Sequence, residues 1–286
     1  MHDSYRLVID CPDRVGIVAR VSQFIAEHSG SLLEASYHAD QLTQRFFMRT
    51  EIAADSLAVT AEEFERRFAK IAAEFAMNWY LRKASEKRRV AMLVSQTSHC
   101  LADLLHRWQS GDLDCEVPCV ISNHANLKDM AGWYGIPFFH VPMPAEAEGK
   151  RAGFAEIQRI LEAHDIDTVV LARFMQIMPA SLCARYPHRM INIHHSFLPS
   201  FIGANPYKRA FERGVKLIGA TCHYVTEQLD EGPIIEQDVI RVGHQHDDKD
   251  MVRLGKDVEA RVLAQGLRLH LQDRAIVQGN KTVIFD

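Results

Sequence analysis

Along residues 1–83, apolar positions recur at helical spacing in some segments and in short strand-like runs in others. Two segments carry apolar residues at helical spacing: Val15, Val18, Val21, Phe24 and Ile25, then Phe64, Phe68, Ile71 and Phe75. Four short runs are typical of strands: residues 5–10, 31–39, 45–52 and 78–81. The resulting order, βαββαβ, is that of the ferredoxin-like fold, in which both helices lie on one face of an antiparallel sheet. The other face of that sheet must find a partner.

A different pattern begins after the polar, basic stretch KASEKRR, which predicts a solvated linker over residues 84–89. Beyond it, apolar strand-like runs alternate with helical segments, and these runs are VAMLVS, VPCVIS, PFFHVP and TVVLA. Such alternation predicts an α/β domain with a doubly wound, mostly parallel sheet over residues 90–286. Two longer strands, LIGATCHYV and PIIEQDVIRV, are expected near one edge, and a helix from Met251 to Leu271 closes the pattern.

Composition and charge limit the possible partners of the chain. Its 286 residues carry a formal net charge of −4, so no global basic field attracts nucleic acid. The N-terminus shows no secretory signal, and the most apolar stretch, VVLARFMQIM, is far shorter than the ~20 residues of a membrane span. Six scattered cysteines without a CxxC pair predict reduced thiols. We therefore expect a cytoplasmic protein with neither nucleic acid nor membrane as a partner.

Candidate chemistry lies where ligands bind in open α/β sheets, beyond the carboxyl ends of the strands. In INIHHSFLPSFIGANPY, Asn192 and His194 are two apart on a strand and point the same way, whereas His195 is expected to point to the opposite side. Asp230 precedes a Gly-Pro turn that starts the next strand. Taken singly, such histidines are more often ordinary buried or surface residues, and Asp230 more often only begins a turn. No Cys or carboxylate lies at zinc-ligand spacing, so we expect no metal.

Three segments, NIHHSFLPSFIGANPY, CHYVTEQLDEGPII and LARFMQIMP, resemble the formyltransferase domain of folate-dependent enzymes. The resemblance is strongest to formyltetrahydrofolate deformylases, which also carry an N-terminal ACT-type domain, and it covers essentially the whole chain. It implies an ACT-type regulatory domain at 1–83 and a formyltransferase-like catalytic domain at 90–286. The implied reaction is hydrolysis of 10-formyltetrahydrofolate to tetrahydrofolate and formate, which supplies formate for purine biosynthesis, with no metal or other cofactor.

The resemblance also assigns roles to residues. The family's catalytic asparagine, histidine and aspartate fall on Asn192, His194 and Asp230, with His195 and His223 in support. Asn192 and protonated His194 would stabilise a tetrahedral oxyanion, while Asp230 would hold His194 or the attacking water and pass protons. Related transferases hold a phosphate with a glycine-rich loop after the first strand, but this chain has QTSHCLADLL there, so water is favoured as the acceptor. A formyltransferase and a non-catalytic folate or amino-acid sensor remain the alternatives.

Two binding sites follow from the same resemblance. The residues expected to bind the folate are Arg173, Phe174, Gln176, Met178, Val225, Thr226 and Glu227. Phe174, Met175 and Met178 would supply the apolar walls, unless they only pack in the core. In the small domain, Asp13, Arg14 and Gly16 form either a helix start capped by Asp13 or an amino-acid effector site. Because ACT-type domains pair their sheets between subunits, we expect a homo-oligomer, a dimer or a tetramer.

Overall fold

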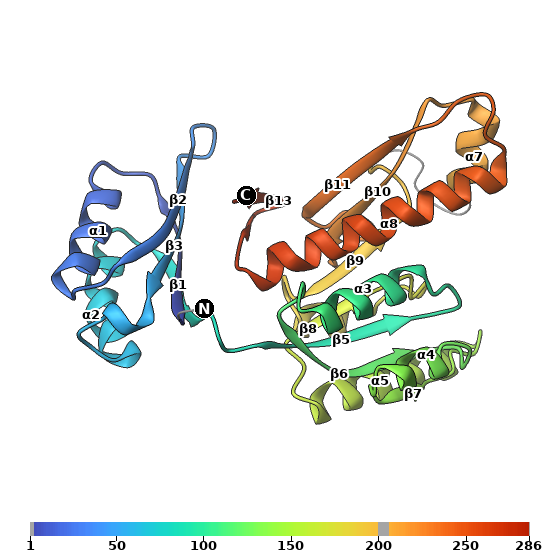
Figure 1. Ribbon diagram of the computed structural model, residues 1–286, viewed down its shortest axis with the longest axis horizontal. Helices are drawn as coiled ribbons and strands as arrows, with labels where there is room; N and C mark the ends of the chain where they lie inside the picture. The colour runs from blue at the N-terminus through green and yellow to red at the C-terminus, as the bar shows by residue number, and fades with distance from the viewer. Residues whose placement is uncertain (1–2, 200–205, 286) are drawn as a thin grey trace. The chain divides into compact units, whose positions relative to one another are not determined.

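The computed structural model describes residues 3–199 and 206–285, and the chain divides into two compact units (Figure 1). The first unit comprises residues up to Lys87 together with Gln272–Ile276 and the end of the chain from Val283, and the second comprises Arg88–Leu271 and Val277–Thr282. This division differs from the expected one at two places. The linker predicted over 84–89 is shorter, because the polar Arg88 and Arg89 already pair with the neighbouring strand. The C-terminal segment, expected in the 90–286 domain, contributes to the first unit.

The first unit has the predicted βαββαβ order, and its four strands form an antiparallel sheet in the order β2-β3-β1-β4. Its elements are β1 (Ser4–Pro12), α1 (Ile17–Glu27), β2 (Leu32–Asp40), β3 (Arg45–Ala53), the 3₁₀ helix Ala54–Ser56, α2 (Ala61–Glu74) and β4 (Asn78–Lys83). Both helices pack their apolar stripes on one face of the sheet, where Phe24, Phe64 and Phe68 form an aromatic cluster. The start of α2 is fixed by Thr60, whose hydroxyl accepts a hydrogen bond from the Glu63 backbone N–H at 3.3 Å. The ferredoxin-like arrangement is therefore confirmed.

The other face of this sheet receives the C-terminal segment of the same chain. Arg49 of β3 is buried, and its Nε donates a hydrogen bond to the carbonyl oxygen of Gln272 at 3.0 Å. The guanidinium of Arg274 lies 2.8 Å from the carboxylate of Glu34, to which Arg49 also donates. The partner that this face required is thus supplied in part by the chain itself.

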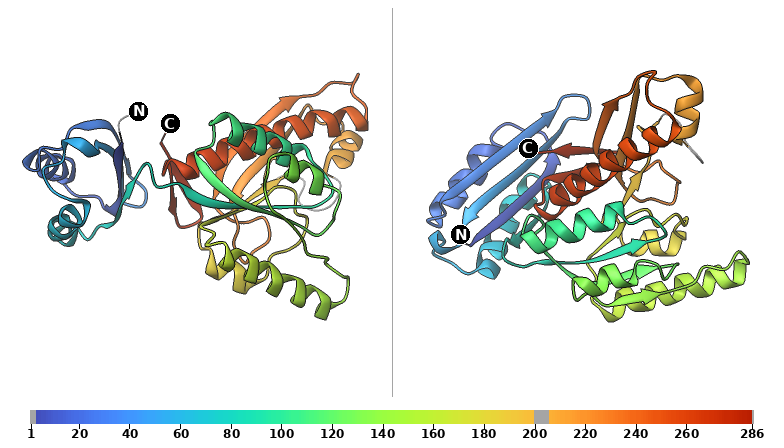
Figure 2. Two further views of the ribbon diagram at one scale, coloured as in Figure 1. Left: turned by 60° about the horizontal axis from the view of Figure 1, so that its bottom comes forward. Right: turned by 45° about the vertical axis from the view of Figure 1, so that its right-hand side comes forward.

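The second unit is a seven-stranded sheet with helices on both faces, as Figure 2 shows. Its elements are β5 (Arg88–Val94), α3 (His99–Ser110), β6 (Cys115–Ser122), α4 (Lys128–Trp133), β7 (Phe138–His140), α5 (Ala147–Ala163), β8 (Thr168–Leu171), α6 (Ala180–Arg185), β9 (Met190–His194), α7 (Pro206–Arg213), β10 (Leu217–Tyr224), β11 (Ile234–Arg241) and α8 (Asp248–Leu271). The strand order is β11-β10-β9-β8-β5-β6-β7. Strands β5 to β9 run parallel to one another, whereas β10 is antiparallel to β9 and β11 is antiparallel to β10. The predicted fold class is confirmed.

The strand order creates a switch point between β5 and β8. From β5 the chain first builds outwards to β6 and β7, and then returns to place β8 and β9 on the other side of β5. In sheets of this kind the crevice at the carboxyl ends of the two central strands is the usual place for a ligand. This topology therefore places the expected ligand crevice at the carboxyl ends of β5 and β8.

A short C-terminal hairpin was not predicted. It consists of β12 (Ala275–Gln278) and β13 (Lys281–Ile284), joined at Gly279, whose φ is +58°. The signal was present in the sequence, since two short apolar runs flank a Gly-Asn pair, which is typical of a tight hairpin turn. The loop expected from Pro199 to Pro206 lies largely outside the described residues.

Candidate active site

A cavity of about 430 Å³ opens at the carboxyl end of the sheet of the second unit, a size typical of small-molecule sites. Segments that follow β8 and β10, together with the end of β9, form its lining. The predicted site residues that line it are Arg173, Gln176, Met178, Asn192, His194, His195, His223, Val225, Thr226, Glu227 and Asp230. Residues from three separate parts of the sequence are thus brought to one cavity.

Asn192 and His194 share one face of β9, because side chains alternate along a strand, and both line the cavity. Asp230 comes from the turn between β10 and β11, where its φ is +57°, a backbone conformation that Asp tolerates better than most residues. Its Oδ2 lies 3.2 Å from Nδ1 of His194. Because a carboxylate can only accept, Nδ1 of His194 carries the proton of this pair, and Nε2 is the nitrogen left for the substrate.

Gly232 allows the Asp230 turn to lie against β10. A Cβ atom at Gly232 would lie 1.8 Å from the carbonyl oxygen of Tyr224, which is far inside contact distance. The same approach lets the Tyr224 N–H donate to the carbonyl oxygen of Pro233 at 2.9 Å. The Glu-Gly-Pro sequence after Asp230 therefore holds the Asp230 turn, and with it the Asp230 carboxylate, close to β10.

His223 on β10 orients the amide of Asn192. The two residues are direct partners in the β9–β10 ladder, and Nδ2 of Asn192 lies 3.2 Å from Nε2 of His223. Nδ1 of His223 is 3.0 Å from the carbonyl oxygen of Tyr224 and must donate to it, so Nε2 of the neutral ring accepts from Asn192. Burial lowers the pKa of His223, which keeps the ring neutral at pH 7. One N–H of the Asn192 amide remains free to point into the cavity.

The charge of Asp230 is set by opposing effects. Burial raises its pKa, but the hydrogen bond and positive charge of His194 outweigh burial and leave the pKa of Asp230 lowered. The carboxylate is therefore ionised at neutral pH. Nε2 of His194 is buried and has no hydrogen-bond partner in the described part of the chain. This pairing suits His194 for moving a proton at Nε2.

The expectation that His195 points away from His194 is wrong, because both line the cavity. Strand β9 ends at His194, so the alternation of side chains ends there too. The His195 ring lies 5.3 Å from the His194 ring and 6.2 Å from the Tyr207 ring, measured between centroids. Burial, aided by the charge of Arg173, lowers the pKa of His195 to about 4. The ring is thus a neutral group beside the cavity.

The loop after β8 alternates its side chains between cavity and core. Arg173 and Met175 both have left-handed backbone, with φ of +66° and +58°, which is uncommon for residues other than glycine and is often found at functional sites. Phe174 between them is 1% exposed and packs in the hydrophobic core, so the expectation that it walls the site is wrong. Met175 and Ile177 line the cavity with Met178 and supply its apolar surface.

The candidate effector residues lie in the first unit. Gly16, with φ of +96°, occupies the position before α1, so the alternative in which Asp13 caps the helix is not what forms. The Asp13 N–H donates to the carbonyl oxygen of Gln44 at 2.9 Å. Nη1 of Arg14 donates to the carbonyl oxygen of Glu74 at 3.3 Å. These bonds hold the strand-to-helix turn against neighbouring loops.

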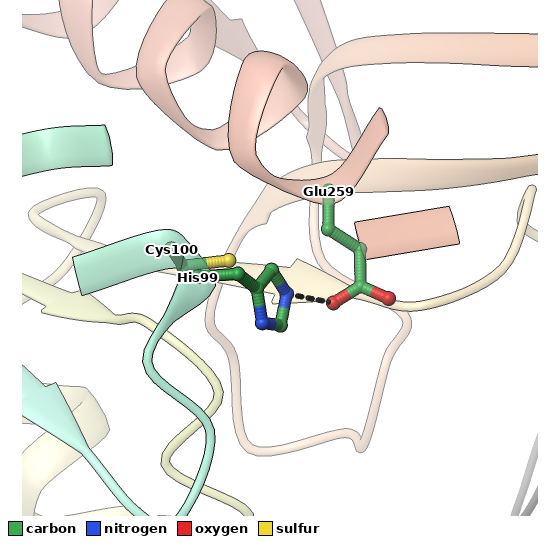
Figure 3. Close-up of side chains that lie close together, drawn as sticks. All are labelled: His99, Cys100 and Glu259. Carbon is green, nitrogen blue, oxygen red and sulfur yellow. Dashed lines mark hydrogen bonds and ion pairs between the residues drawn. The ribbon is translucent and has the colours of Figure 1, made fainter. Parts of the chain in front are cut away.

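A cluster that sequence reasoning missed surrounds the carboxylate of Glu259, which is 1% exposed on α8. Figure 3 shows His99, at the start of α3, bonded through Nε2 to Glu259 Oε2 at 2.8 Å, with Cys100 beside it. The Tyr207 hydroxyl donates to Oε1 at 2.5 Å, and Nε of Arg173 lies 3.4 Å from Oε2. We refer to Glu259, His99, Tyr207 and Arg173 as the Glu259 network.

Two members of the network, His99 and Glu259, lie close to Cys100, and all three side chains are of types that bind metals. Their geometry argues for a charge cluster instead. The carboxylate already accepts from a phenol and an imidazole and faces a guanidinium, and a cation placed there would be repelled by Arg173. Burial raises the pKa of Cys100, so its sulfur stays a neutral thiol rather than the thiolate that metals bind.

These features, a doubly wound sheet with an Asn, His and Asp set at its carboxyl edge, define an α/β enzyme whose class the comparisons identify. The formyl transferase family matches residues 88–267, more than half of the chain, and the chain belongs to that family. Among the described residues, every helix is too short or too polar to cross a lipid bilayer.

Full-length relatives narrow the assignment. The chain is 46% identical to the formyltetrahydrofolate deformylase of Bacillus subtilis (strain 168), over 99% of this chain and 94% of that protein. It is 57% identical to a formyltetrahydrofolate deformylase of Pseudomonas syringae, whose structure matches 100% of this chain and 95% of that one with a TM-score of 0.97. A glycinamide ribonucleotide transformylase from Symbiobacterium toebii is 31% identical and matches 73% of this chain and 98% of its own, with a TM-score of 0.67. The chain is thus a member of the formyltetrahydrofolate deformylases.

Proposed function

We propose that this chain hydrolyses 10-formyltetrahydrofolate to tetrahydrofolate and formate, with Asn192, His194 and Asp230 as the catalytic residues. The observation that carries the proposal is their arrangement. An amide with a free N–H, an imidazole and an ionised carboxylate line one cavity, and the His194–Asp230 pair is 3.2 Å apart. Formyltetrahydrofolate deformylases of the same length and fold support the choice of substrate.

The folate is held by the two loops that face each other across the cavity. Residues 225–227 follow β10 and offer backbone N–H and C=O groups, which are suited to the donor and acceptor edge of a pterin. The loop after β8 supplies Gln176 as a polar contact, with Met175, Ile177 and Met178 as the apolar surface. A mostly apolar slot with a few fixed polar groups is the usual design of such sites. Arg173 borders the slot on the side of His195.

The chemical step begins with water. Its oxygen attacks the formyl carbon, and the carbonyl oxygen becomes a tetrahedral oxyanion. The free N–H of Asn192 and the Nε2–H of protonated His194 donate to that oxyanion, and one such donor contributes about 2.7 to 4 kcal/mol in measured enzymes. Because His223 fixes the Asn192 amide, this donor needs no reorganisation when charge develops.

Proton movement completes the reaction. Asp230 stabilises the charged form of His194 and accepts from the attacking water, a role that contributes about 10² to 10⁴ in rate. When the tetrahedral intermediate collapses, the bond between the formyl carbon and N10 breaks and His194 gives its Nε2 proton to N10. The products are tetrahydrofolate and formate, and exchange with solvent then removes the proton from Asp230 and returns one to Nε2 of His194. Every step is carried by side chains of the cavity, and we propose that no metal or other cofactor takes part.

The direct test is formate release from 10-formyltetrahydrofolate in buffer that contains no amine acceptor. We expect tetrahydrofolate and formate in equal amounts, at a rate that a chelator does not change. Turnover only after addition of an amine would identify a formyltransferase, and folate binding without any turnover would identify a sensor. Either outcome would refute the proposed function.

For the first unit we propose an ACT-type regulatory domain that binds an amino acid at Asp13, Arg14 and Gly16, within a homo-oligomer. The βαββαβ order and the left-handed Gly16 at the strand-to-helix turn support this assignment. We expect one of the common amino acids to raise the melting temperature of the protein, and Arg14→Ala to abolish that rise. Light scattering should give the mass of a dimer or tetramer. A panel of amino acids without effect, or the mass of a single chain, would refute the respective part.

A further inference from the structure

The Glu259 network occupies the crevice in which a doubly wound sheet ordinarily takes a ligand. His99 is the first residue of α3, the helix that follows β5, and Arg173 lies in the loop after β8. Strands β5 and β8 are parallel neighbours at the switch point of the sheet. A helix that starts just after such a strand offers free backbone N–H groups and a positive dipole end to an anionic ligand. In this chain the carboxylate of Glu259 lies beside that position, 2.8 Å from Nε2 of His99.

Close packing brings the parts of the network together. A Cβ atom at Gly255 would lie 2.2 Å from Cζ of Tyr207, so the tyrosine ring rests directly on α8. From there its hydroxyl reaches Glu259, which lies one turn further along the same helix. Glu259 thereby joins α8 to the start of α3, to α7 and to the loop after β8.

The crevice is filled rather than merely narrowed. Tyr207 is 7% exposed, and the side chains of His99 and Arg173 are 16% and 14% exposed. The network borders the cavity of the active site at Arg173 and at His195, whose ring neighbours that of Tyr207. A second substrate would therefore have to displace these side chains before it could reach the formyl group.

Stability alone does not account for this arrangement. Buried ion pairs contribute little net stability, and similar volumes of apolar side chain are often as good or better. Nη1 of Arg173 is buried and lacks a hydrogen-bond partner in the described part of the chain, which is a further cost. Exclusion of a second substrate better explains why a cluster of this kind lies at the ligand crevice of an enzyme.

We propose that the Glu259 network determines the acceptor: it fills the crevice for a second substrate with the protein's own side chains, so that water and nucleophiles of similar size reach the formyl carbon and larger nucleophiles do not. The inference rests on the proposed function and extends it. A phosphate-bearing amine is excluded by the volume of the network, because the carboxylate of Glu259 and its partners already occupy the position near the start of α3. Larger neutral nucleophiles are excluded by the same volume.

The test measures how the formyl group partitions between water and added nucleophiles of increasing size. Each reaction contains 10-formyltetrahydrofolate and one of three reagents: hydroxylamine, O-methylhydroxylamine or O-benzylhydroxylamine. Formate and the N-formyl product are then quantified by mass spectrometry. In the transfer, the nucleophile's nitrogen attacks the formyl carbon, the bond to N10 breaks, and the proton lost by the nucleophile passes to N10. The last two reagents differ mainly in size, so their ratio isolates the effect of volume.

For the wild-type protein we expect the ratio of N-formyl product to formate to fall at least about tenfold from O-methylhydroxylamine to O-benzylhydroxylamine. The double variant Arg173→Ala/Glu259→Ala removes both charges together. In this variant we expect the difference between the two reagents in the ratio of N-formyl product to formate to shrink by about tenfold. Arg261→Ala is the matched control on the same helix, because its exposed side chain pairs with Asp238 at the surface. The control should keep the wild-type ratio.

Two results would overturn the inference. One is a wild-type protein that formylates the benzyl reagent as readily as the methyl reagent, a measurement that requires no variant. The other is a double variant that melts cooperatively, still releases formate and keeps the wild-type ratio. Failure of the proposed function would look different, since wild-type protein would then release no formate when no nucleophile is added.

Discussion

Replacing Asp230 by Asn removes one negative charge from the active site and changes almost nothing else. Asn has the same shape, and it tolerates a φ near +57° as well as Asp does, so the turn should form. The carboxylate lies 3.2 Å from Nδ1 of His194 and 3.8 Å from Nε2 of His223. Its loss therefore removes the group that stabilises protonated His194 and accepts from the attacking water. We expect kcat to fall by about 10² to 10⁴, which corresponds to about 3 to 5 kcal/mol.

The assay follows formate release under steady-state conditions, together with folate binding by fluorescence. We expect KM and the affinity for a folate analogue to change by less than about threefold, because the lost interaction belongs to the transition state. Asp238→Asn is the control, a half-exposed carboxylate on β11. A variant at Asp230 with near wild-type kcat would refute the catalytic role of Asp230. A loss confined to KM would show that Asp230 serves binding alone.

Three further predictions concern neighbouring parts of the site. Asn192→Ala should lower kcat by about 10² to 10³ in the formate assay, because it removes one oxyanion donor, and an unchanged kcat would exclude that role. Gly232→Ala should lower kcat and the melting temperature together, since its Cβ would collide with the carbonyl of Tyr224; a variant with unchanged kcat would show that the turn has shifted harmlessly. The pKa of His195 is lowered to about 4, so the unfolded chain binds more protons as pH falls below about 6.5, and the folded state loses stability. Between pH 7 and pH 5 the wild type should lose about 2 kcal/mol more than His195→Gln in urea unfolding, and equal losses would contradict the buried, neutral ring.

The repeating elements of both units could be predicted from the sequence because their signals are local. Helical spacing in Phe64, Phe68 and Ile71 identifies α2, and the Thr60 cap identifies its first turn. The convergence of Asn192 and His194 follows from the two-residue period of a strand. Predicting that Asp230 joins the site also required the family resemblance, because no local sequence signal shows that its turn folds back over β9.

Other parts depended on contacts that a single sequence does not display. Phe174 packs in the core because left-handed residues on either side turn it away from the cavity, and apolar character alone does not distinguish the two environments. His195 lies beyond the last strand residue, so its direction is set by the bend rather than by alternation. In the sequence Glu259 is an ordinary charged residue of a long helix, and only the structure shows its partners from α3, α7 and the loop after β8.

The account depends most on solvent being the species that attacks the formyl carbon under the control of Asn192, His194 and Asp230. A single-turnover reaction in H₂¹⁸O, with the formate analysed by mass spectrometry, measures this directly. The account predicts one ¹⁸O atom in each formate, produced at the rate at which tetrahydrofolate appears. Formate without the label, or tetrahydrofolate released while the formyl group remains on the protein or on another acceptor, would contradict it.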